Sequence, residues 1–566
     1  MIDHDINKSE LTYYLNNIVK YDRLSGGKGE LNALEFIQEE LNKCGISNTL
    51  YKYPAYLSNP VYGKLYILED SSKTEIEAKT RSFSKNTFGK EIKGELIYID
   101  EGSLIDSIIE YNLKKTDLKK DLENKIVISE SLNPISVLEV QNRGAIGFIQ
   151  YWNGNENEIH EGIYNPIWGA PGYEDIDYYP RIPIIAINGK YGKKIVEKLS
   201  YERIDVSMCT VLEEGIQLIP ILEANIEPKN DNDGKFILIG NHIDSWHYGA
   251  TDNGTGNALA LYLAKYYKSI ISKFNIGVKI AWWSGHSNGR YAGSSAYAAD
   301  KFEELLEGCI AYVNIDMPGL RGANDYTNIS SGPSLIELSK QKIFEVTNQI
   351  GFYSGTVRGW DQSFQNIGIT PYFIWGSTLE KNHPDTTNDT FMSWWWHTEK
   401  DLLKYSDMDV LEKDTILYIS AINDLLLYGL NAFNIEELFK LIYDTLNEYN
   451  KEYFYIKNLD SLIDKVEETW GLFTSLEDTL NQDEKLNLIK LLNRIYYVSR
   501  EIYLQDYALQ EKPIPRLSEI FRIYESSNKI EYRFILDKHL TSEKNRVLNI
   551  LIEVMRLLKS RTKEKL

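Results

Sequence analysis

The spacing of apolar residues changes along the chain and divides it into segments of different structure. Between residues 31 and 41, leucine and isoleucine recur every three or four positions, which predicts an amphipathic helix. From about residue 60 to 210, short apolar runs such as KIVISE (125–130) and IPIIAIN (182–188) are separated by loops rich in Gly, Asn and Asp. This pattern is typical of short strands and predicts a β-rich unit, in which no residue looks catalytic.

From about residue 215 to 430, strand-like and helix-like segments alternate. FILIGNHID (236–244), GVKIAWW (277–283) and CIAYVNID (309–316) are predicted strands, and NALALYLAKYYKSII (257–271) is a predicted helix. The alternation predicts an α/β sheet with helices on its faces, in which catalysis gathers at the carboxyl ends of the strands. The polar residues at or just beyond such ends are His242, Asp244, His286 and Asp316.

The chain after residue 430 is predicted to be helical. Apolar residues recur at helical spacing over 459–473 and again over 486–495. Pro513 and Pro515 interrupt the pattern before further predicted helices. Such stripes are typical of a helical core or a subunit contact.

Composition excludes several classes of function. With 566 residues the chain is too long for one hydrophobic core, and its formal net charge of −20 argues against nucleic-acid binding and against docking on an anionic membrane. The three cysteines, Cys44, Cys209 and Cys309, are far apart, so neither a disulfide framework nor a thiolate metal cluster is expected. The sequence has no basic-then-apolar start and no apolar run of membrane-spanning length, and we expect a cytoplasmic location.

Histidine is scarce, and its positions point to one segment. Among the eight histidines, His242 is followed two positions later by Asp244, whose carboxylate can support that histidine as a metal ligand. Eight residues further, Asp252 lies in a glycine-rich turn just before a predicted helix, and this turn can bring its carboxylate back toward His242. The alternative is that Asp252 only caps the helix.

Further segments in the same order give this pattern a specific meaning. HIDSWHYGATDNGTGNALAL (242–261) is followed by AWWSGHSNGRYAGSSAY (281–297), YVNIDMPG (312–319) and WWWHTEKD (394–401), and RLSGGKGELNALEFIQEEL (23–41) precedes them. Together these segments resemble the motifs of the co-catalytic zinc exopeptidases. That family contains bacterial leucine aminopeptidases, glutamate carboxypeptidase II and transferrin receptor.

The resemblance implies a domain organisation for the whole chain. A zinc exopeptidase domain is expected from residues 1–60 and 215–430. Residues 61–214 resemble the β-rich protease-associated domain that several members carry as an insertion, and residues 431–566 resemble the helical dimerising domain. The expected fold class is therefore α/β, with a mixed-sheet exopeptidase domain, an inserted β-rich domain and a C-terminal helical domain.

The resemblance also implies two zinc ions and their ligands. Transferred residue by residue, Asp252 bridges the two ions. His242 and Asp316 complete the ligands of one ion, and His397 serves the other. Asp244 takes part in catalysis by orienting His242. Two such ions together activate a water molecule and polarise the scissile carbonyl.

The sequence departs from the family where two adjacent glutamates are expected, one a general base and one a zinc ligand. Here the pair is Gly285-His286, with about two residues inserted after it. His286 can still bind zinc or act in catalysis, because imidazole is as acceptable a ligand as carboxylate. Gly285 cannot take a proton, and a general base contributes about 10²–10⁴-fold to the rate. If the protein is a variant hydrolase, the base is then His286, His247 or Glu399.

Three residues are candidates for substrate binding. Arg290 and Tyr291 lie in the inserted loop, where either could hold a substrate carboxylate or stabilise an oxyanion. Arg358, ahead of the segment GWDQSF, suggests the same role. The alternative for each arginine is a solvated side chain on a loop.

The predicted function is hydrolytic removal of a terminal residue from a peptide by a metal-bound hydroxide, in an aminopeptidase-like or carboxypeptidase-like metallopeptidase. The expected partners are a peptide substrate and a second copy of the chain, bound through the helical domain, and neither nucleic acid nor membrane. The competing hypotheses are a metal site with little turnover or another substrate, and a non-catalytic relative that acts as a binding or scaffold protein.

Overall fold

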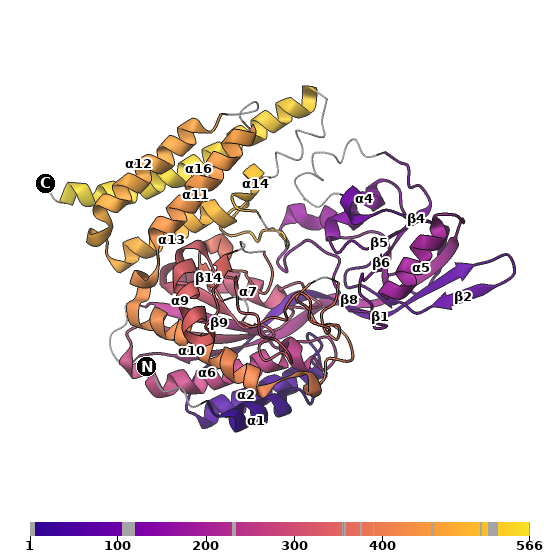
Figure 1. The fold of residues 1–566 in the computed structure, drawn as a ribbon, viewed down its shortest axis with the longest axis horizontal. Helices are drawn as coiled ribbons and strands as arrows, with labels where there is room; N and C mark the ends of the chain where they lie inside the picture. Colours follow the sequence, from indigo (N-terminus) through magenta and orange to yellow (C-terminus); the bar gives the residue numbers. More distant parts are fainter. Residues whose placement is uncertain are drawn as a thin grey trace.

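The computed structural model of the chain describes residues 6–104, 119–228, 234–509, 512–518 and 530–564, except 354, 356–357, 374–375, 389 and 454–457. Its elements are arranged around one long mixed sheet, with helices on the faces of one half and a group of C-terminal helices beyond it (Figure 1). The mixed α/β fold and the helical C-terminal region predicted from the sequence are therefore confirmed.

The large sheet has 12 strands in the order β14-β11-β9-β10-β8-β4-β5-β6-β7-β3, with β1 beside β8 and β2 beside β1. The strands of this sheet are β1 Ser47–Leu68, β2 Lys73–Ile76, β3 Lys79–Thr80, β4 Ile92–Tyr98, β5 Lys125–Ser129, β6 Gly147–Tyr151, β7 Ile184–Ile187, β8 Asp205–Ile226, β9 Phe236–His242, β10 Gly277–Trp283, β11 Cys309–Asn314 and β14 Thr370–Tyr372. A small second sheet pairs β12 Asn328–Ile329 with β13 Phe352–Tyr353.

The described residues also form helices of 4 to 35 residues. They are α1 Lys8–Ile18, α2 Lys28–Lys43, α4 Pro134–Asn142, α5 Gly189–Leu199, α6 Thr255–Ile270, α7 Ala292–Asp300, α8 Phe302–Gly308, α9 Ile336–Thr347, α10 Met408–Tyr428, α11 Ile435–Tyr453, α12 Asp460–Leu476, α13 Gln482–Tyr497, α14 Pro515–Ser518 and α16 Ile530–Glu564.

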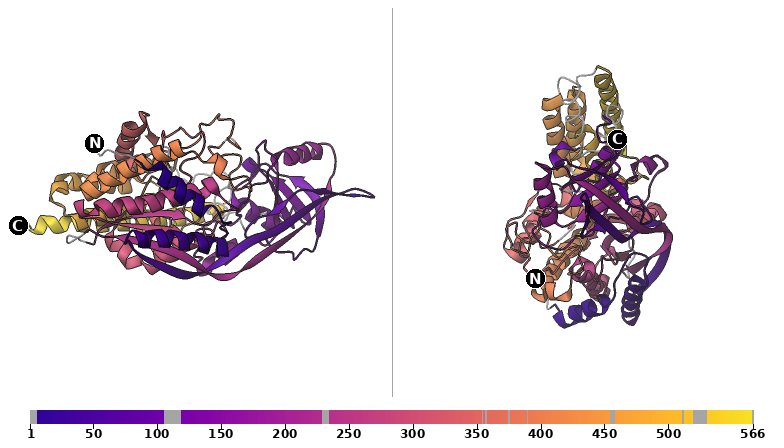
Figure 2. Two further views of the ribbon diagram at one scale, coloured as in Figure 1. Left: turned by 90° about the horizontal axis from the view of Figure 1, so that it is seen from below. Right: turned by 90° about the vertical axis from the view of Figure 1, so that its right-hand side faces the viewer.

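Two strands of 22 residues each, β1 and β8, run the length of the sheet as an antiparallel ribbon (Figure 2). They pair from Ser47 opposite Asn225 to Leu68 opposite Asp205, with one irregularity between Pro60 and Tyr62. The predicted domain boundaries at residues 60 and 214 thus fall within this ribbon, near that irregularity. The ribbon is continuous from one half of the sheet to the other, which the short apolar runs did not predict.

One half of the sheet contains the parallel strands β14, β11, β9 and β10, with β8 antiparallel beside β10. Every residue of β9 and β10 is buried, as expected for strands covered on both faces. Ile237, Ile239 and Ile280 point into a core shared with α1, α2, α6 and α10. Leu238 and Trp283 point to the other face, against a second core that includes residues of α7 and α8. Helices therefore cover both faces, as predicted.

The residues between β1 and β8 (69–204), called here the intervening unit, form the other half. Strands β4, β5, β6 and β7 are mutually parallel, and two apolar clusters pack on their faces. Helices α4 and α5 also belong to this unit and were not anticipated from its β-rich texture. Its identity as a protease-associated domain stays a prediction.

The C-terminal helices α11, α12, α13 and α16 pack on one another and on the parallel half of the sheet. Phe439, Phe473, Leu492 and Val554 belong to the same apolar core as β9 and α10. Among the described helices no single one passes a test of length and composition for a membrane span, while the pair 408–432 and 435–451, bent by 73°, passes it jointly. The predicted dimer contact is untested.

Candidate metal centre

Five of the predicted site residues meet at the carboxyl ends of the parallel strands. His242 is the last residue of β9, His286 lies three residues after β10, and Asp316 lies two residues after β11. Because these three strands are neighbours in the sheet, their ends bring the three side chains together. Asp252 is in the turn before α6, and His397 is in the loop between β14 and α10. All five are buried or nearly so.

His242 faces two carboxylates with one nitrogen and a carbonyl with the other. Its Nε2 lies 3.1 Å from Asp252 Oδ1 and 3.3 Å from Asp316 Oδ1. Its Nδ1 lies 2.9 Å from the backbone oxygen of Asp244, which can only accept. The Nδ1–H therefore donates to that carbonyl, which fixes the orientation of the ring and turns Nε2 toward the carboxylates.

Asp252 divides its two carboxylate oxygens between two histidines. Oδ1 faces His242, and Oδ2 lies 3.1 Å from His397 Nε2. The Nδ1 of His397 donates to the backbone oxygen of Glu161 at 3.2 Å, so its Nε2 is likewise the nitrogen directed at Asp252. The arrangement is that of a carboxylate placed to bridge two cations.

The pKa shifts of His242, His397 and Asp252 also favour a charged carboxylate between the two histidines. Although burial alone would lower it, the charges of Asp316 and Asp252 raise the pKa of His242 well above its ordinary value. Burial lowers the pKa of His397. Burial would raise the pKa of Asp252, but its contacts with His242 and His397 hold it well below the ordinary value. A carboxylate charge is thus maintained where the two imidazole nitrogens meet.

The donor set fits divalent zinc. An imidazole lone pair directed at a carboxylate oxygen is repelled unless a cation, a proton or a metal ion, lies between them. Two ligands each about 2.0 Å from a tetrahedral zinc ion lie about 3.3 Å apart. The three nitrogen–oxygen distances here, 3.1, 3.3 and 3.1 Å, are close to that value.

Two buried side chains from elsewhere hold the loops of this centre. Asp401 accepts from the backbone N–H groups of Thr251 and Asp252, each at 2.9 Å, which fixes the turn that carries the bridging carboxylate. Burial raises the pKa of Asp401 to about 7. The guanidinium of Arg23, fully buried, donates to the carbonyls of Ile243, Tyr248 and Gly249 and so fixes the loop after β9.

Asp244 contacts His242 in a different way from the one expected. Its Oδ1 is 3.9 Å from His242 Nδ1, beyond hydrogen-bond distance. The carboxylate instead accepts from Ser25 Oγ at 2.6 Å and from the backbone N–H groups of His286 and Ser287. Asp244 therefore orients His242 through its carbonyl, while its carboxylate ties the first helical segment to the loop after β10.

His286 is held by a carboxylate that sequence reasoning missed. Its Nδ1 lies 2.6 Å from Asp361 Oδ2, and its ring stacks on that of His242 with centroids 3.8 Å apart. Ser294 Oγ donates to the other oxygen of Asp361 at 2.6 Å. One nitrogen each of His286 and His242 and an oxygen of Asp316 lie within 4.8 Å of one another, a spacing that suits a shared metal ion.

Gly285 occupies a backbone conformation that disfavours any side chain. Its φ is +74°, in the left-handed region, and a Cβ built there would lie 3.0 Å from Cδ1 of Ile219. A glutamate at this position would therefore require the loop after β10 to change its course.

The predicted substrate residues form an aromatic and cationic stack beside His286. Tyr291 meets His286 edge-on, with ring centroids 4.8 Å apart, and stacks on Trp168 at 4.1 Å. The guanidinium of Arg290 lies 5.5 Å from the ring of Tyr291, and that of Arg358 lies 4.4 Å from the ring of Trp168. The structure thus brings all three predicted residues to one wall.

The two arginines differ in their partners. Arg358 is buried and donates to Gln365 at 3.2 Å and to Gln505 at 2.6 Å. Arg290 is 8% exposed, and within the described part of the chain its Nε has no hydrogen-bond partner. Burial without a nearby carboxylate lowers the pKa of Arg290. Because an unpaired buried guanidinium is unfavourable, Arg290 is suited to receive an anion.

The two other residues predicted as possible general bases, His247 and Glu399, lie in a neighbouring group, called here the Lys79 cluster. It consists of Lys79, Glu161, His247 and Glu399. Lys79 Nζ lies 2.8 Å from Glu161 and 2.6 Å from Glu399, and His247 Nε2 lies 3.2 Å from Glu161. The ligand atoms of the two glutamates and the histidine are close enough for a metal ion, but the ammonium group of Lys79 already contacts both carboxylates.

Sequence reasoning missed Asp361, Asp401 and Glu161. Asp361 and Asp401 lie in two segments quoted above from the sequence, GWDQSF and WWWHTEKD, but each is one of several polar residues there, and nothing in the spacing distinguishes it. Glu161 lies in a loop of the intervening unit, 236 residues before its contact His397. No local spacing relates residues so far apart, so only the fold could find that contact.

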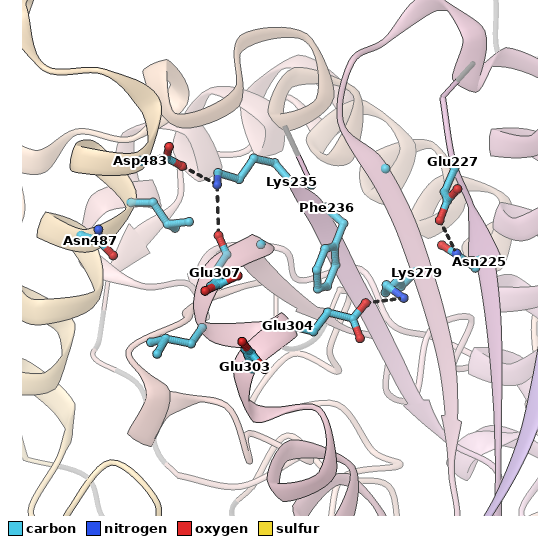
Figure 3. Close-up of a pocket in the computed structure, with 15 residues that line it drawn as sticks. Asn225, Glu227, Lys235, Phe236, Lys279, Glu303, Glu304, Glu307, Asp483 and Asn487 are labelled. Carbon is cyan, nitrogen blue, oxygen red and sulfur yellow. Dashed lines mark hydrogen bonds and ion pairs between the residues drawn. The ribbon is translucent and has the colours of Figure 1, made fainter. Parts of the chain in front are cut away.

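A cavity of about 940 Å³ lies at the opposite end of the same strands (Figure 3). It is lined by the first residues of β9 and β10, Phe236 and Gly277, and by α8 and α13. Its lysines are paired, Lys235 with Asp483 at 2.5 Å and Lys279 with Glu304 at 2.8 Å. It is remote from His242, at the far end of β9, and has no part in the candidate metal centre.

Comparisons with known proteins show a likeness to one peptidase family over part of the chain. Residues 222–420 match the profile of Peptidase family M28. Probable glutamate carboxypeptidase AMP1 of Arabidopsis thaliana is 19% identical over 422 residues, which cover 61% of this chain and 58% of the plant protein. Aminopeptidase YwaD of Bacillus subtilis is 27% identical over 206 residues, which cover 35% of this chain and 42% of the bacterial protein. The matches thus span less than two thirds of these relatives.

Solved structures with the same fold include two bacterial aminopeptidases. One is the aminopeptidase from Aneurinibacillus sp. strain AM-1, with a TM-score of 0.56 and 20% identity over 74% of this chain and 93% of that chain. The other is BSAP, a zinc aminopeptidase from Bacillus subtilis, with a TM-score of 0.53 and 16% identity over 74% and 95%. The resemblance to zinc exopeptidases is thereby confirmed. The segment matched to the family contains all five residues of the candidate centre.

Proposed function

We propose that this chain is a zinc-dependent exopeptidase whose centre holds two ions between His242, Asp252, Asp316, His286 and His397. The observation that carries the proposal is the position of Asp252, with one carboxylate oxygen on the Nε2 of His242 and the other on the Nε2 of His397. The match to Peptidase family M28 supports metallopeptidase chemistry at this place.

The proposed ligands form two sets that share Asp252. His242 and Asp316 complete one set, with His286 close enough to share it, and His397 belongs to the other. When bound, two divalent ions in such a site supply an activated water molecule and a polarised scissile carbonyl. The carbonyls of Asp244 and Glu161 hold the two Nδ1–H groups, so the Nε2 atoms of His242 and His397 are left free to bind.

His286 takes the place at which the family has an acidic pair. Asp361 accepts from its Nδ1, which leaves the other ring nitrogen unprotonated and able either to bind a cation or to take a proton. We propose that His286, oriented by Asp361, supplies one of the two roles of the missing glutamates, because its one free ring nitrogen cannot bind a cation and take a proton at the same time. His247 and Glu399 are the competing bases, and both are already paired within the Lys79 cluster.

We propose further that Arg290 and Tyr291 contact the substrate. The buried guanidinium of Arg290, with Nε unpaired among the described residues, suits a carboxylate of a peptide or the oxyanion that forms on its carbonyl. Arg358 is engaged by two glutamines, and its part in the proposal is to support Trp168, on which Tyr291 stacks.

The competing function is a metal-binding or scaffold protein without turnover. The test combines the zinc content of the purified protein with a panel of aminopeptidase and carboxypeptidase substrates. Two bound ions with turnover that falls at least about 100-fold in His286→Ala support the peptidase. Bound zinc without turnover on any substrate favours the binding protein. A wild-type protein that takes up no zinc overturns the proposal.

A further inference from the structure

We propose that His160 and Glu161 of the intervening unit are positioning residues for His397, and that the ion held by His397 depends on this unit while the ion held by His242 and Asp316 does not. The inference rests on the proposed function in one respect, namely that His397 is a metal ligand. It assigns a role at the metal centre to a part of the chain in which the sequence indicated none.

The contact between the two segments involves two successive residues on each side. The backbone N–H of Glu161 donates to the carbonyl of His397 at 2.7 Å, and His397 Nδ1–H donates back to the carbonyl of Glu161 at 3.2 Å. One position earlier, Nδ1 of His160 donates to the carbonyl of Trp396 at 2.5 Å. These three hydrogen bonds fix both the backbone and the ring of His397 relative to residues 160–161.

His397 needs such support because its own segment provides little. The residue has φ +57°, in the left-handed region that a side chain disfavours, and lies outside any strand or helix. Its ring stacks on Trp396, with centroids 3.5 Å apart, and Trp396 in turn contacts Trp152 of the intervening unit. The packing as well as the hydrogen bonding of His397 therefore involves that unit.

Glu161 is itself fixed by charges on both sides. Its carboxylate is 8% exposed and accepts from Lys79 at 2.8 Å and from His247 at 3.2 Å. Lys79 lies on β3 in the intervening unit and His247 in the loop after β9, so Glu161 joins the unit to the loop that leads from His242 to Asp252.

His160 is fixed in the same unit. Its ring, fully buried, stacks on Trp152 with centroids 4.5 Å apart, and its Nε2 lies 2.7 Å from Glu156. The carbonyl of His160 accepts from the buried guanidinium of Arg81, which follows β3. Residues 160–161 are thus a rigid part of the intervening unit, capable of holding a ligand in place.

The two proposed ligand sets consequently differ in what positions them. His242 and Asp316 follow neighbouring strands of the parallel half, whose hydrogen bonds set their separation. The position of His397 instead depends on contacts with the intervening unit, which is connected to the parallel half of the sheet through β1 and β8. Contacts that orient a metal-binding histidine typically change metal affinity about 10–100-fold when removed. Removing the contacts to His397 should therefore weaken the binding of the ion that His397 holds and leave the other ion's affinity unchanged.

The test measures zinc affinity by competition with a chelator in the full chain carrying Glu161→Gln or His160→Phe. Glu161→Gln removes the charge that binds Lys79 and His247, and His160→Phe removes the bond to Trp396 while keeping the stack on Trp152. We expect one of the two ions to bind at least about 10-fold more weakly and the other to stay within about twofold. Glu95→Gln is the matched control, because Glu95 pairs with Lys125 and Arg203 in the same unit, on β4.

Two results would overturn the inference. One is unchanged affinity for both ions in both variants. The other is equal weakening of both ions, which would indicate general loosening instead of positioning. In a double variant with His397→Ala, the effect of Glu161→Gln on metal affinity should disappear, because the residue through which it acts is gone.

A metal-independent measurement separates this inference from the proposed function. If the wild-type protein takes up no zinc, the proposed function fails. Crystal structures of the metal-free wild type and Glu161→Gln then decide the positioning role. A displaced His397 ring with its contact to Asp252 broken supports it, and a ring in the same place in both structures overturns it.

Discussion

Two clusters rich in metal-ligand side chains lie next to each other in this molecule, and they differ in what neutralises their carboxylates. In the candidate metal centre, the ion-pair partners of Asp252 and Asp316 among the described residues are imidazole nitrogens. In the Lys79 cluster, Glu161 and Glu399 contact the ammonium group of a lysine at 2.8 and 2.6 Å. Similar residue types thus form two different sites. The metal centre needs a cation to compensate its carboxylates, whereas the Lys79 cluster already contains the ammonium group of Lys79.

The comparison teaches that ligand identity alone does not mark a metal site. A buried carboxylate must be compensated by a nearby cation, by hydrogen bonds or by protonation. In the Lys79 cluster, the ammonium group of Lys79 compensates the two glutamates without a metal ion. The contacts of this cluster instead connect the intervening unit to the loops of the metal centre. Among the described residues, Asp252 and Asp316 form ion pairs with histidines and none with lysine or arginine, although the charge of the buried Arg23 also interacts with Asp252. Histidine protons or metal ions therefore supply the close compensation.

The largest effect is expected from Asp252→Asn, which tests whether the centre depends on one shared carboxylate. The variant should lose both zinc ions and with them all turnover, because an amide oxygen binds zinc far less well than a carboxylate that serves two ions. Zinc content by elemental analysis checks this. Asp300→Asn, at the end of α7 with a hydrogen bond to Tyr53, is the control. Retained stoichiometry of two would refute the bridging role.

The next effect contrasts one residue from each cluster. His286→Ala should lower kcat/KM at least about 100-fold, whereas Glu399→Gln should change it less than about threefold, because Glu399 is half exposed and paired with Lys79. Steady-state kinetics on the best substrate of the panel measures both. A large loss of kcat in Glu399→Gln with unchanged zinc content would transfer the role of base to the Lys79 cluster.

Asp414, another buried carboxylate, extends the comparison to a third site, where the described residues form no ion pair with it. Asp414 accepts from the backbone N–H groups of Gly319 and Ser377 and from the Ser377 hydroxyl, and burial raises its pKa to about 6. Because the folded pKa is above the unfolded value of 3.8, the contribution of Asp414 to stability is complete below about pH 4 and is lost as the pH rises through 6.

The corresponding measurement compares wild type with Asp414→Asn. Relative to the variant, the wild-type free energy of unfolding should fall by about 3 kcal/mol between pH 4 and pH 7, which is the free energy of a shift of about two pKa units. Denaturant unfolding at several pH values gives this difference. A difference that does not vary with pH would show that the carboxyl group keeps one protonation state throughout.

The smallest effect concerns Gly285, in the loop after β10, where the resemblance led us to expect a glutamate. Gly285→Ala should destabilise the protein by about 1–2 kcal/mol, because φ +74° is unfavourable for a residue with a Cβ. Thermal unfolding measures it. Gly215→Ala is the control, since a Cβ there meets nothing within 4 Å. Equal stability of the two variants would mean that the loop after β10 can change its backbone without cost, and a glutamate could then be accommodated.

Periodicity predicted much of the fold because it depends on local spacing. Helix α2 and strands β9 and β10 lie where the apolar patterns placed them, since each must bury the same side chains whatever its neighbours are. The ribbon of β1 and β8 escaped prediction. Its two strands are stabilised by pairing with each other across more than 130 residues of intervening sequence, and polar residues such as Glu213 and Glu214 occur within it.

The sequence by itself determined which side chains are candidates for the centre, because His242, Asp252, Asp316 and His397 occur in recognisable motifs in a fixed order. Only the tertiary structure decided which groups hold those residues, since Asp361, Asp401 and Glu161 reach them from distant loops. The physical reason is the difference in sequence separation between the two kinds of information. A ligand's type is a property of one residue, whereas its orientation depends on hydrogen bonds from whatever part of the chain the fold brings beside it.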